Sequence, residues 1–343
     1  FTDVPELRSN SLVVLDGDKT LAEGAIAKML KARPAPFMHE KSARLLTAGN
    51  IEDNLDLLAG ADWILEAIVE DPKIKHDLYV KLEGARKKGS IVTSNTSTIP
   101  LAKLIEGLPE SFQRDFAVTH FFNPPRYMRL FELGGGPKTR ADALKALAEF
   151  ADVRLGKEVV ACKDTPGFIA NRIGIYWMNV AMSLAFEQGL TIEEADAVVG
   201  RPMGVPKTGI FGLADLTGID LAPHVNASML KLLPKSDAFV KGYDADGPLA
   251  RTMTKLIAEG YTGRKGKGGF YRAKGKEVLD PSSGGYRSLQ KADLDSVKAA
   301  KAGLRALVEH PDKGGVYAWA VLSRVLSYAA LLVPEIADDI LAV

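Results

Sequence analysis

Residues 159–172 read VVACKDTPGFIANR, and this stretch separates two parts of the chain that have different patterns. The run at 159–162 is typical of a buried strand, whereas Thr165 followed by Pro166 is typical of the start of a helix. Before this point, short apolar runs alternate with amphipathic stretches, and after it the pattern stays largely helical. The sequence therefore predicts an α/β domain followed by an all-α domain.

The alternation in the first part predicts a doubly wound, Rossmann-like sheet. The predicted strands are residues 11–15, 63–69, 90–93, 116–119 and 159–162, and the predicted helices are 21–31, 74–87 and 141–154. A long, mostly apolar helix over 169–188 opens the second part. We predict a sheet domain at 1–164, a helical domain at 165–288, and a linker with the start of a second helical domain at 289–343.

The composition excludes several classes of protein. The chain has 343 residues, of which 46% are hydrophobic, and its 44 basic and 43 acidic residues give a net charge of +1. A charge this small leaves no global field to attract nucleic acid. The single cysteine, Cys162, can form neither an internal disulfide nor a thiolate zinc site, which favours a reducing compartment and predicts a cytoplasmic protein. None of the five histidines has a partner at metal-ligand spacing, so no metal site is predicted.

The longest apolar tract, residues 316–333, contains Ser323, Arg324 and Ser327. We interpret it as a buried helix and expect no membrane span. The chain begins without Met, in a pattern typical of the end of a strand, and it stops within a helical pattern. We therefore expect a fragment of a longer protein.

Polar side chains follow three of the predicted strands. Glu70 follows the strand at 63–69, the run Ser94-Asn95-Thr96-Ser97 follows 90–93, and His120 follows 116–119. Ligands of open α/β sheets bind beyond the carboxyl ends of the strands, so these residues predict one shared crevice. Roles in turns and helix caps explain the same residues equally well, and both interpretations stand at this point.

Glu132 lies twelve residues beyond His120 and closes the run 129–132. A hairpin-like return of the chain would bring the two side chains together. A carboxylate bonded to an imidazole fixes its tautomer and raises its basicity, which suits a general base. A lone acid in this position is more often only a strand-end residue.

Two segments of the helical part resemble each other. Asn171-Arg172-Ile173 and Ser323-Arg324-Val325 each lie in an apolar helix that is followed by an acidic turn. The distances to those turns differ, so duplication and coincidence both stand. In the case of a duplication, we expect Val321, Val325 and Tyr328 to share one helix face and to be buried together.

Five motifs occur in an order that resembles the L-3-hydroxyacyl-CoA dehydrogenase family. They read EAIVE (66–70), SNTS (94–97), HFFNP (120–124), KDTPGFIANR (163–172) and KGKGGFY (265–271). The stretch PPRYM at 124–128 is most similar to the bacterial branch that is fused to an enoyl-CoA hydratase. In that branch a degenerate second helical domain follows the first.

The resemblance implies NAD-dependent oxidation of an L-3-hydroxyacyl-CoA in fatty acid β-oxidation. It implies a catalytic base at His120, a paired acid at Glu132, and contacts with the substrate oxygen from Ser97 and Asn171. The positions that match NAD contacts of the family are Ala67, Glu70, Lys75, Asn95, Ser97, Asn123 and Lys265. The partners it implies are an acyl-CoA substrate, a fused enoyl-CoA hydratase domain, and either a homodimer or an intramolecular pairing of helical domains.

The chain departs from the family at its start. The family opens with a strand, a GxGxxG turn and a helix, whereas no GxGxxG follows a strand here. We therefore predict an N-terminally truncated sheet domain and an inactive isolated fragment. The acid that bonds the ribose has two candidates, Asp3 and Asp16, of which we favour Asp3. Two other functions remain open: a hydroxy-acid dehydrogenase of the same build without CoA, and a non-catalytic scaffold.

Overall fold

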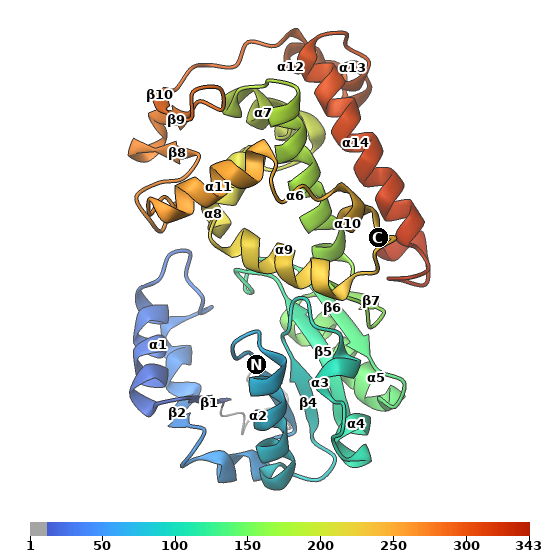
Figure 1. Cartoon of the computed structure of the whole chain (residues 1–343). Helices are drawn as coiled ribbons and strands as arrows, with labels where there is room; N and C mark the ends of the chain where they lie inside the picture. Colours follow the sequence, from blue (N-terminus) through green and yellow to red (C-terminus); the bar gives the residue numbers. More distant parts are fainter. Residues whose placement is uncertain (1–11) are drawn as a thin grey trace. The chain divides into compact units, whose positions relative to one another are not determined.

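The computed structural model describes residues 12–343 as two compact units (Figure 1). The first unit contains the chain up to Phe168 together with residues 336–338 and 342. The second contains residues 169–335, 339–341 and 343. The change of pattern at residues 159–172 therefore coincides with the change of unit.

The first unit is a Rossmann-like α/β domain whose strands form two sheets. A parallel pair joins β1 (Leu12–Asp16) to β2 (Leu46–Asn50), and a five-stranded sheet has the order β3-β4-β5-β6-β7. The five strands are β3 (Trp63–Glu66), β4 (Ile91–Ser94), β5 (Phe116–Phe121), β6 (Leu130–Gly135) and β7 (Glu158–Cys162). Strands β3, β4 and β5 are parallel, whereas β6 and β7 run antiparallel to β5. The α/β prediction is confirmed, and β6 makes the hairpin-like return expected after His120. The sequence did not predict β2 or the division into two sheets.

α-Helices flank the strands of the first unit, and the first of them contacts the parallel pair β1-β2. They are α1 (Lys19–Lys31), α2 (Pro72–Ala85), α3 (Leu101–Leu104), α4 (Glu110–Asp115) and α5 (Ala141–Glu149). Helix α2 begins after Asp71, whose side chain accepts from the Ile74 N–H group, with Pro72 in the first turn, as helix capping favours. Helix α4 packs against β4 and α5 against β6, so the apolar face of each is buried against the sheet.

The second unit is mainly helical. Its helices are α6 (Ala170–Glu187), α7 (Ile192–Val198), α8 (Gly209–Thr217), α9 (Leu221–Leu232), α10 (Ala238–Gly242), α11 (Pro248–Ala258), α12 (Asp295–Ala299), α13 (Leu304–Val308) and α14 (Lys313–Leu332). A small antiparallel sheet, β10-β9-β8, interrupts the helical pattern; it comprises β8 (Tyr271–Arg272), β9 (Glu277–Leu279) and β10 (Tyr286–Ser288). The prediction of a largely helical second part is confirmed, and these three short strands are the part of it that the sequence did not predict. The Asp215 carboxylate on α8 accepts the N–H groups of Phe270 and Tyr271 and so holds the chain where β8 begins.

The expected boundary near residue 288 does not separate compact units. Leu294, Leu307 and Val321 are buried in the same core as Leu184 of α6 and Phe211 of α8. These apolar side chains are removed from water by packing into the core that α6 and α8 share. The segment after residue 288 therefore belongs to the second unit.

Helix α14 runs along α6 in the second unit (Figure 1). Val321 and Tyr328 are buried, and Val325 is partly buried against the core. By length and composition alone α14 is able to cross a membrane, and 33% of its most apolar 18-residue stretch is buried inside the structure. A core helix of a soluble protein meets the same criterion.

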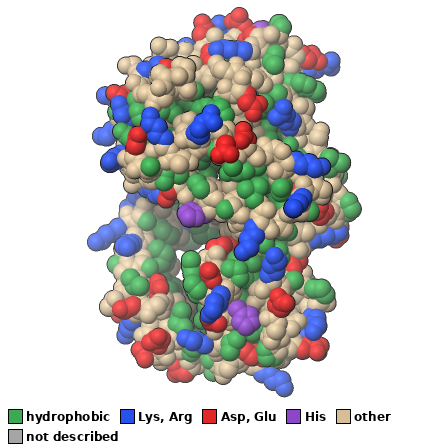
Figure 2. Space-filling model, viewed as in Figure 1, with side chains coloured by type: hydrophobic (Ala, Val, Ile, Leu, Met, Phe, Trp, Pro, Cys, Tyr) green, Lys and Arg blue, Asp and Glu red, His purple; other side chains and the backbone are tan. Residues whose placement is uncertain are grey.

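Charged side chains of both signs are interspersed over the face drawn in Figure 2. No large area of one sign is visible on that face, as a net charge of +1 leads one to expect.

Candidate active site

His120 and Glu132 form a buried hydrogen-bonded pair in the first unit. The antiparallel register of β5 and β6 places the two residues directly opposite each other. His120 Nδ1 lies 2.7 Å from Glu132 Oε2, and the side chains are 5% and 1% exposed. The pair arises because facing positions of an antiparallel ladder project their side chains on the same side of the sheet.

This geometry equips His120 to accept a proton. With the Glu132 carboxylate accepting from Nδ1–H, the imidazole keeps Nε2 unprotonated as an acceptor. A positive charge formed on the ring after proton uptake is stabilised by the adjacent carboxylate. The arrangement therefore suits general-base catalysis.

Aromatic rings enclose the imidazole. The ring centroid of Phe122 lies 4.5 Å from that of His120, and the centroid of Phe168 lies 6.0 Å away. Phe168 is fully buried and has a left-handed φ of 50°, following Gly167 with a φ of 77°. Such a conformation costs a non-glycine residue free energy and occurs most often at functional sites. The rings exclude water beside the base and strengthen its pairing with Glu132.

Glu70 organises the loop that follows β4. Its Oε1 accepts hydrogen bonds from the Thr96 hydroxyl at 2.7 Å, the Ser97 N–H at 2.9 Å and the Thr98 N–H at 3.1 Å. Burial alone raises the pKa of the Glu70 carboxyl, but these hydrogen bonds and the nearby Lys75 ammonium bring that pKa below its usual value. Glu70 thus remains a carboxylate that fixes the position of Ser97.

A buried polar cluster lies beneath this loop. The Glu66 carboxylate accepts from Lys75 Nζ at 2.7 Å, from the Tyr79 hydroxyl at 2.6 Å and from the Ser94 hydroxyl at 2.6 Å. The Lys75 side chain is 1% exposed, and its ammonium also lies 3.4 Å from Glu70. Lys75 is therefore buried behind Glu70 and reaches the crevice only by its ion pair with that residue. The resemblance instead implies that Lys75 contacts the cofactor.

Asn95 joins the ends of two neighbouring strands. Its Oδ1 accepts from the N–H of Phe121 at 2.9 Å, which ties the end of β4 to the end of β5 beside His120. Ala67 and Asn123 are exposed, just beyond the ends of β3 and β5 respectively. The structure thus gathers most residues of the predicted crevice at the carboxyl ends of β3, β4 and β5.

Three predicted site residues belong to other elements of the fold. Asn171 is in α6 of the second unit, and Lys265, in the same unit, is paired with Asp220 at 2.8 Å. Asp16 is exposed at the carboxyl end of β1. Asp3 lies outside the described residues, so the choice between Asp3 and Asp16 stays a prediction.

Lys157 supports the loop after His120, and sequence analysis missed it. Its ammonium donates to the carbonyl oxygens of Pro125 and Met128, the latter at 2.6 Å, and lies 5.7 Å from the centre of the Phe121 ring. The residue is 6% exposed, and this burial lowers the pKa of its ammonium. No local signal marks Lys157, because its partners lie about thirty residues away in the chain.

We expect Lys157→Met to destabilise the first unit by about 1–3 kcal/mol, because two carbonyl oxygens lose a charged donor. Urea unfolding of the protein measures this loss. The matched control is Lys145→Met on the exposed face of α5, which is expected to change stability by less than about 0.5 kcal/mol. Equal stability of the two variants would contradict the role of Lys157.

Family models match most of the chain. The NAD-binding domain of 3-hydroxyacyl-CoA dehydrogenase matches residues 11–165, and the C-terminal domain of the same enzyme matches residues 167–273. Among solved structures, FadB2 of M. tuberculosis aligns with a TM-score of 0.66 and 26% identity, over 76% of this chain and 90% of that one. The 3-hydroxybutyryl-CoA dehydrogenase of Escherichia coli K12 aligns with a TM-score of 0.64 and 25% identity, over 78% of this chain and 56% of that one.

Curated relatives agree with the family models. A probable 3-hydroxyacyl-CoA dehydrogenase of Bacillus subtilis is 37% identical over 94% of this chain and 41% of its own length. A putative fatty acid oxidation complex trifunctional enzyme of Rickettsia felis is 36% identical over 95% of this chain, and the chain spans 45% of its length. A probable 3-hydroxyacyl-CoA dehydrogenase of Deinococcus radiodurans is 42% identical over 76% of this chain and 73% of its own length. The chain therefore belongs to the 3-hydroxyacyl-CoA dehydrogenase family.

Proposed function

We propose that this chain carries the dehydrogenase part of an enzyme that oxidises L-3-hydroxyacyl-CoA to 3-ketoacyl-CoA with NAD, as in fatty acid β-oxidation. The observation that supports it best is the buried His120–Glu132 pair at 2.7 Å beside the carboxyl ends of β3, β4 and β5. Oxidation of a secondary alcohol needs a base at the hydroxyl group, and this pair supplies one.

In the proposed reaction, His120 Nε2 takes the proton of the substrate C3 hydroxyl as the C3–O bond becomes a carbonyl. NAD, when bound, supplies the acceptor for the hydride that leaves C3. Glu132 holds the imidazole through Nδ1 and stabilises the imidazolium that forms. Ser97, fixed through its N–H by Glu70, and Asn171 are proposed to hold the substrate oxygen.

The described residues fit only part of an NAD molecule. The exposed residues Ala67 and Asn123, with Glu70, Asn95 and Ser97 between them, form a polar strand-end surface suited to a nicotinamide and its ribose. Within residues 12–343, no strand leads through a GxGxxG turn into a helix. The helix after β1 is capped instead by Asp18, whose carboxylate accepts the Thr20 N–H and repels a pyrophosphate.

We therefore expect residues 1–343 alone to bind NAD weakly, with a Kd above about 1 mM. Isothermal titration calorimetry of NAD into this chain measures it. Addition of a strand, a GxGxxG turn and a helix before residue 1 is expected to restore binding. A micromolar Kd for residues 1–343 would overturn this expectation.

The activity is tested on the intact protein by oxidation of NADH with acetoacetyl-CoA as substrate. Oxidation with acetoacetyl-CoA but not with free acetoacetate supports the proposal. Equal rates with the two substrates favour the alternative, a hydroxy-acid dehydrogenase that does not need CoA. Failure of the intact protein to bind any nicotinamide cofactor favours a non-catalytic scaffold.

The proposal extends to a longer, multifunctional protein in the cytoplasm. Its support is the size of the relatives, of which this chain spans 41% and 45%, and the name trifunctional enzyme carried by one of them. A fused enoyl-CoA hydratase domain and pairing of helical domains, within the chain or in a homodimer, belong to this proposal. Hydration of crotonyl-CoA by the intact protein, and its mass by light scattering, test these two parts.

A further inference from the structure

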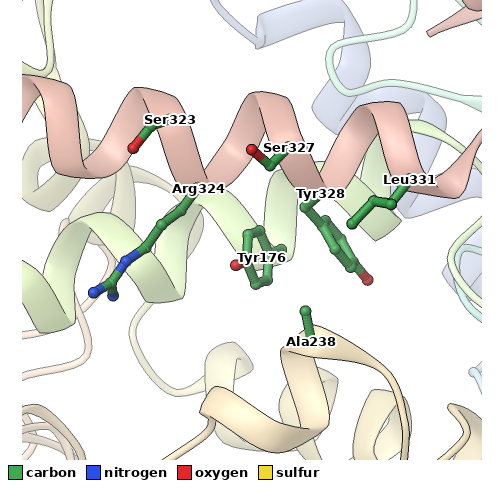
Figure 3. A pocket seen from close by; sticks show the side chains of 7 residues that line it. All are labelled: Tyr176, Ala238, Ser323, Arg324, Ser327, Tyr328 and Leu331. Carbon is green, nitrogen blue, oxygen red and sulfur yellow. The ribbon is translucent and has the colours of Figure 1, made fainter.

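A pocket of about 280 Å³ lies between helices α6, α10 and α14 of the second unit (Figure 3). One charged side chain, the guanidinium of Arg324, lines it together with several polar groups. The lining residues are Tyr176, Ala238, Ser323, Arg324, Ser327, Tyr328 and Leu331. The pocket thus contains hydrogen-bond donors and a positive charge but no carboxylate.

Arg324 has no acidic partner in the part of the chain that the structure describes. Its side chain is exposed, and within residues 12–343 it makes neither an ion pair nor a hydrogen bond. In Figure 3 it extends from α14 along the side of the pocket where the Tyr176 hydroxyl lies. Ser323 and Ser327 present hydroxyl groups from the same helix.

Arg172 on α6 shows what such an arginine binds in this fold. Its guanidinium donates to the Tyr328 hydroxyl at 2.7 Å, to Asp237, and to Glu335 at 3.1 Å. It lies 6.0 Å from the centre of the Tyr328 ring. Arg172 is therefore surrounded by two carboxylates and by Tyr328, which belongs to helix α14.

The surroundings of Arg324 repeat this arrangement with the two helices exchanged. Arg172 and Arg324 are 152 residues apart, as are Tyr176 and Tyr328. The two tyrosine rings stack at 4.0 Å, and their hydroxyl groups point in opposite directions (Figure 3). Arg172 bonds Tyr328, and Arg324 is close enough to Tyr176 that its charge opposes the rise in the tyrosine pKa that burial causes. The repeat therefore has a filled carboxylate site at Arg172 and an open one at Arg324.

We propose that the pocket at Arg324 is a binding site for a carboxylate group. Arg324 provides the planar fork that pairs with a carboxylate, and the hydroxyls of Ser327 and Tyr176 provide further donors. The carboxylate comes either from an Asp or Glu side chain of a protein segment or from a small organic acid. This proposal does not rest on the dehydrogenase activity.

The test uses the 343-residue chain and follows the guanidinium Nε–Hε signals of its arginines by NMR. Acetate is titrated at constant ionic strength, with chloride as the reference. The Arg324 signal, assigned by its loss in Arg324→Gln, is expected to shift with saturation at millimolar acetate. The signal of Arg201, an exposed arginine of the same unit without a partner among the described residues, is the control and is expected to move at least tenfold less.

A second arm distinguishes the two sources of the carboxylate. The probe is a peptide that copies residues 233–243 (LPKSDAFVKGY), in which Asp237 begins helix α10 and bonds Arg172 in the filled site. At least tenfold tighter binding of this peptide than of acetate, lost when its Asp is replaced by Asn, assigns the site to a protein segment. Binding no tighter than that of acetate assigns it to a small acid.

Three outcomes would overturn the proposal. Two of them are equal responses of Arg324 and Arg201 to acetate, and a stronger response of Arg324 to inorganic phosphate than to acetate. The third is an unchanged acetate affinity in Arg324→Lys, measured in this variant and in the unchanged chain by the ring signals of Tyr176, which lines the pocket. The lysine variant keeps the charge without the fork, so we expect at least a threefold loss of affinity. The near-ultraviolet circular dichroism of each variant, to which the stacked rings of Tyr176 and Tyr328 contribute, checks that its aromatic packing is kept.

Discussion

Replacement of His120 with alanine is expected to lower kcat of the intact protein by about a hundred- to ten-thousand-fold, the range of general-base catalysis. The imidazole is the only described histidine that a buried carboxylate holds at the strand ends, with Nδ1 2.7 Å from Glu132. NAD affinity is expected to stay within about twofold, because the loss concerns the proton of the hydroxyl group. Steady-state kinetics with acetoacetyl-CoA, together with NAD titration, measures both quantities.

Glu132→Gln tests whether the negative charge of Glu132 contributes beyond holding the His120 ring in place. The amide retains the volume of Glu132 but no longer stabilises the imidazolium, so kcat is expected to fall while the KM for substrate changes little. The control is His76→Ala, which removes a histidine whose Nε2 bonds the Glu106 carbonyl away from this pair. A loss of less than tenfold in His120→Ala, or an equal loss in His76→Ala, would show that the pair is not the base.

Local signals in the sequence indicated this pair as one of two interpretations, and the resemblance to the family selected it. The strand at 116–119 ends at a histidine, and the next apolar run ends at an acid twelve residues later. A short return between adjacent antiparallel strands leaves few registers, and the one observed sets His120 opposite Glu132. The change from alternating to helical pattern at residues 159–172 located the change of unit for the same reason.

Contacts between distant residues were beyond sequence analysis. Lys157 reads as an ordinary surface lysine, yet it is buried against two carbonyl groups about thirty residues away. Strand β2 reads Leu-Thr-Ala-Gly-Asn, so it lacks the apolar run that marks the other strands. Strands β8 to β10 are two or three residues long, and Asp215 fixes them from a separate helix. Each of these features depends on tertiary packing that one sequence does not encode locally.

Asp237→Ala is expected to lower the free energy of unfolding by about 3–5 kcal/mol, the loss typical of a broken buried ion pair. The side chains of Arg172 and Asp237 are 0% and 3% exposed, and the carboxylate also accepts the Phe239 N–H as the cap of α10. Removal of Asp237 leaves a buried guanidinium with only the half-exposed Glu335 as an acidic partner. Urea unfolding followed by circular dichroism measures the change.

Two further variants show whether the loss comes from an unpaired charge. Glu335→Ala removes the carboxylate that is 49% exposed, and we expect a cost below about 1 kcal/mol. The double variant Arg172→Met with Asp237→Leu removes both charges and is expected to be more stable than Asp237→Ala, because no buried charge is left without a partner. The single variants Arg172→Met and Asp237→Leu complete the comparison. If the double variant loses as much free energy of unfolding as these two combined, the pair acts through packing alone. Arg172 would then no longer serve as the template from which the carboxylate site at Arg324 is inferred, since that inference requires the arginine to need an acid.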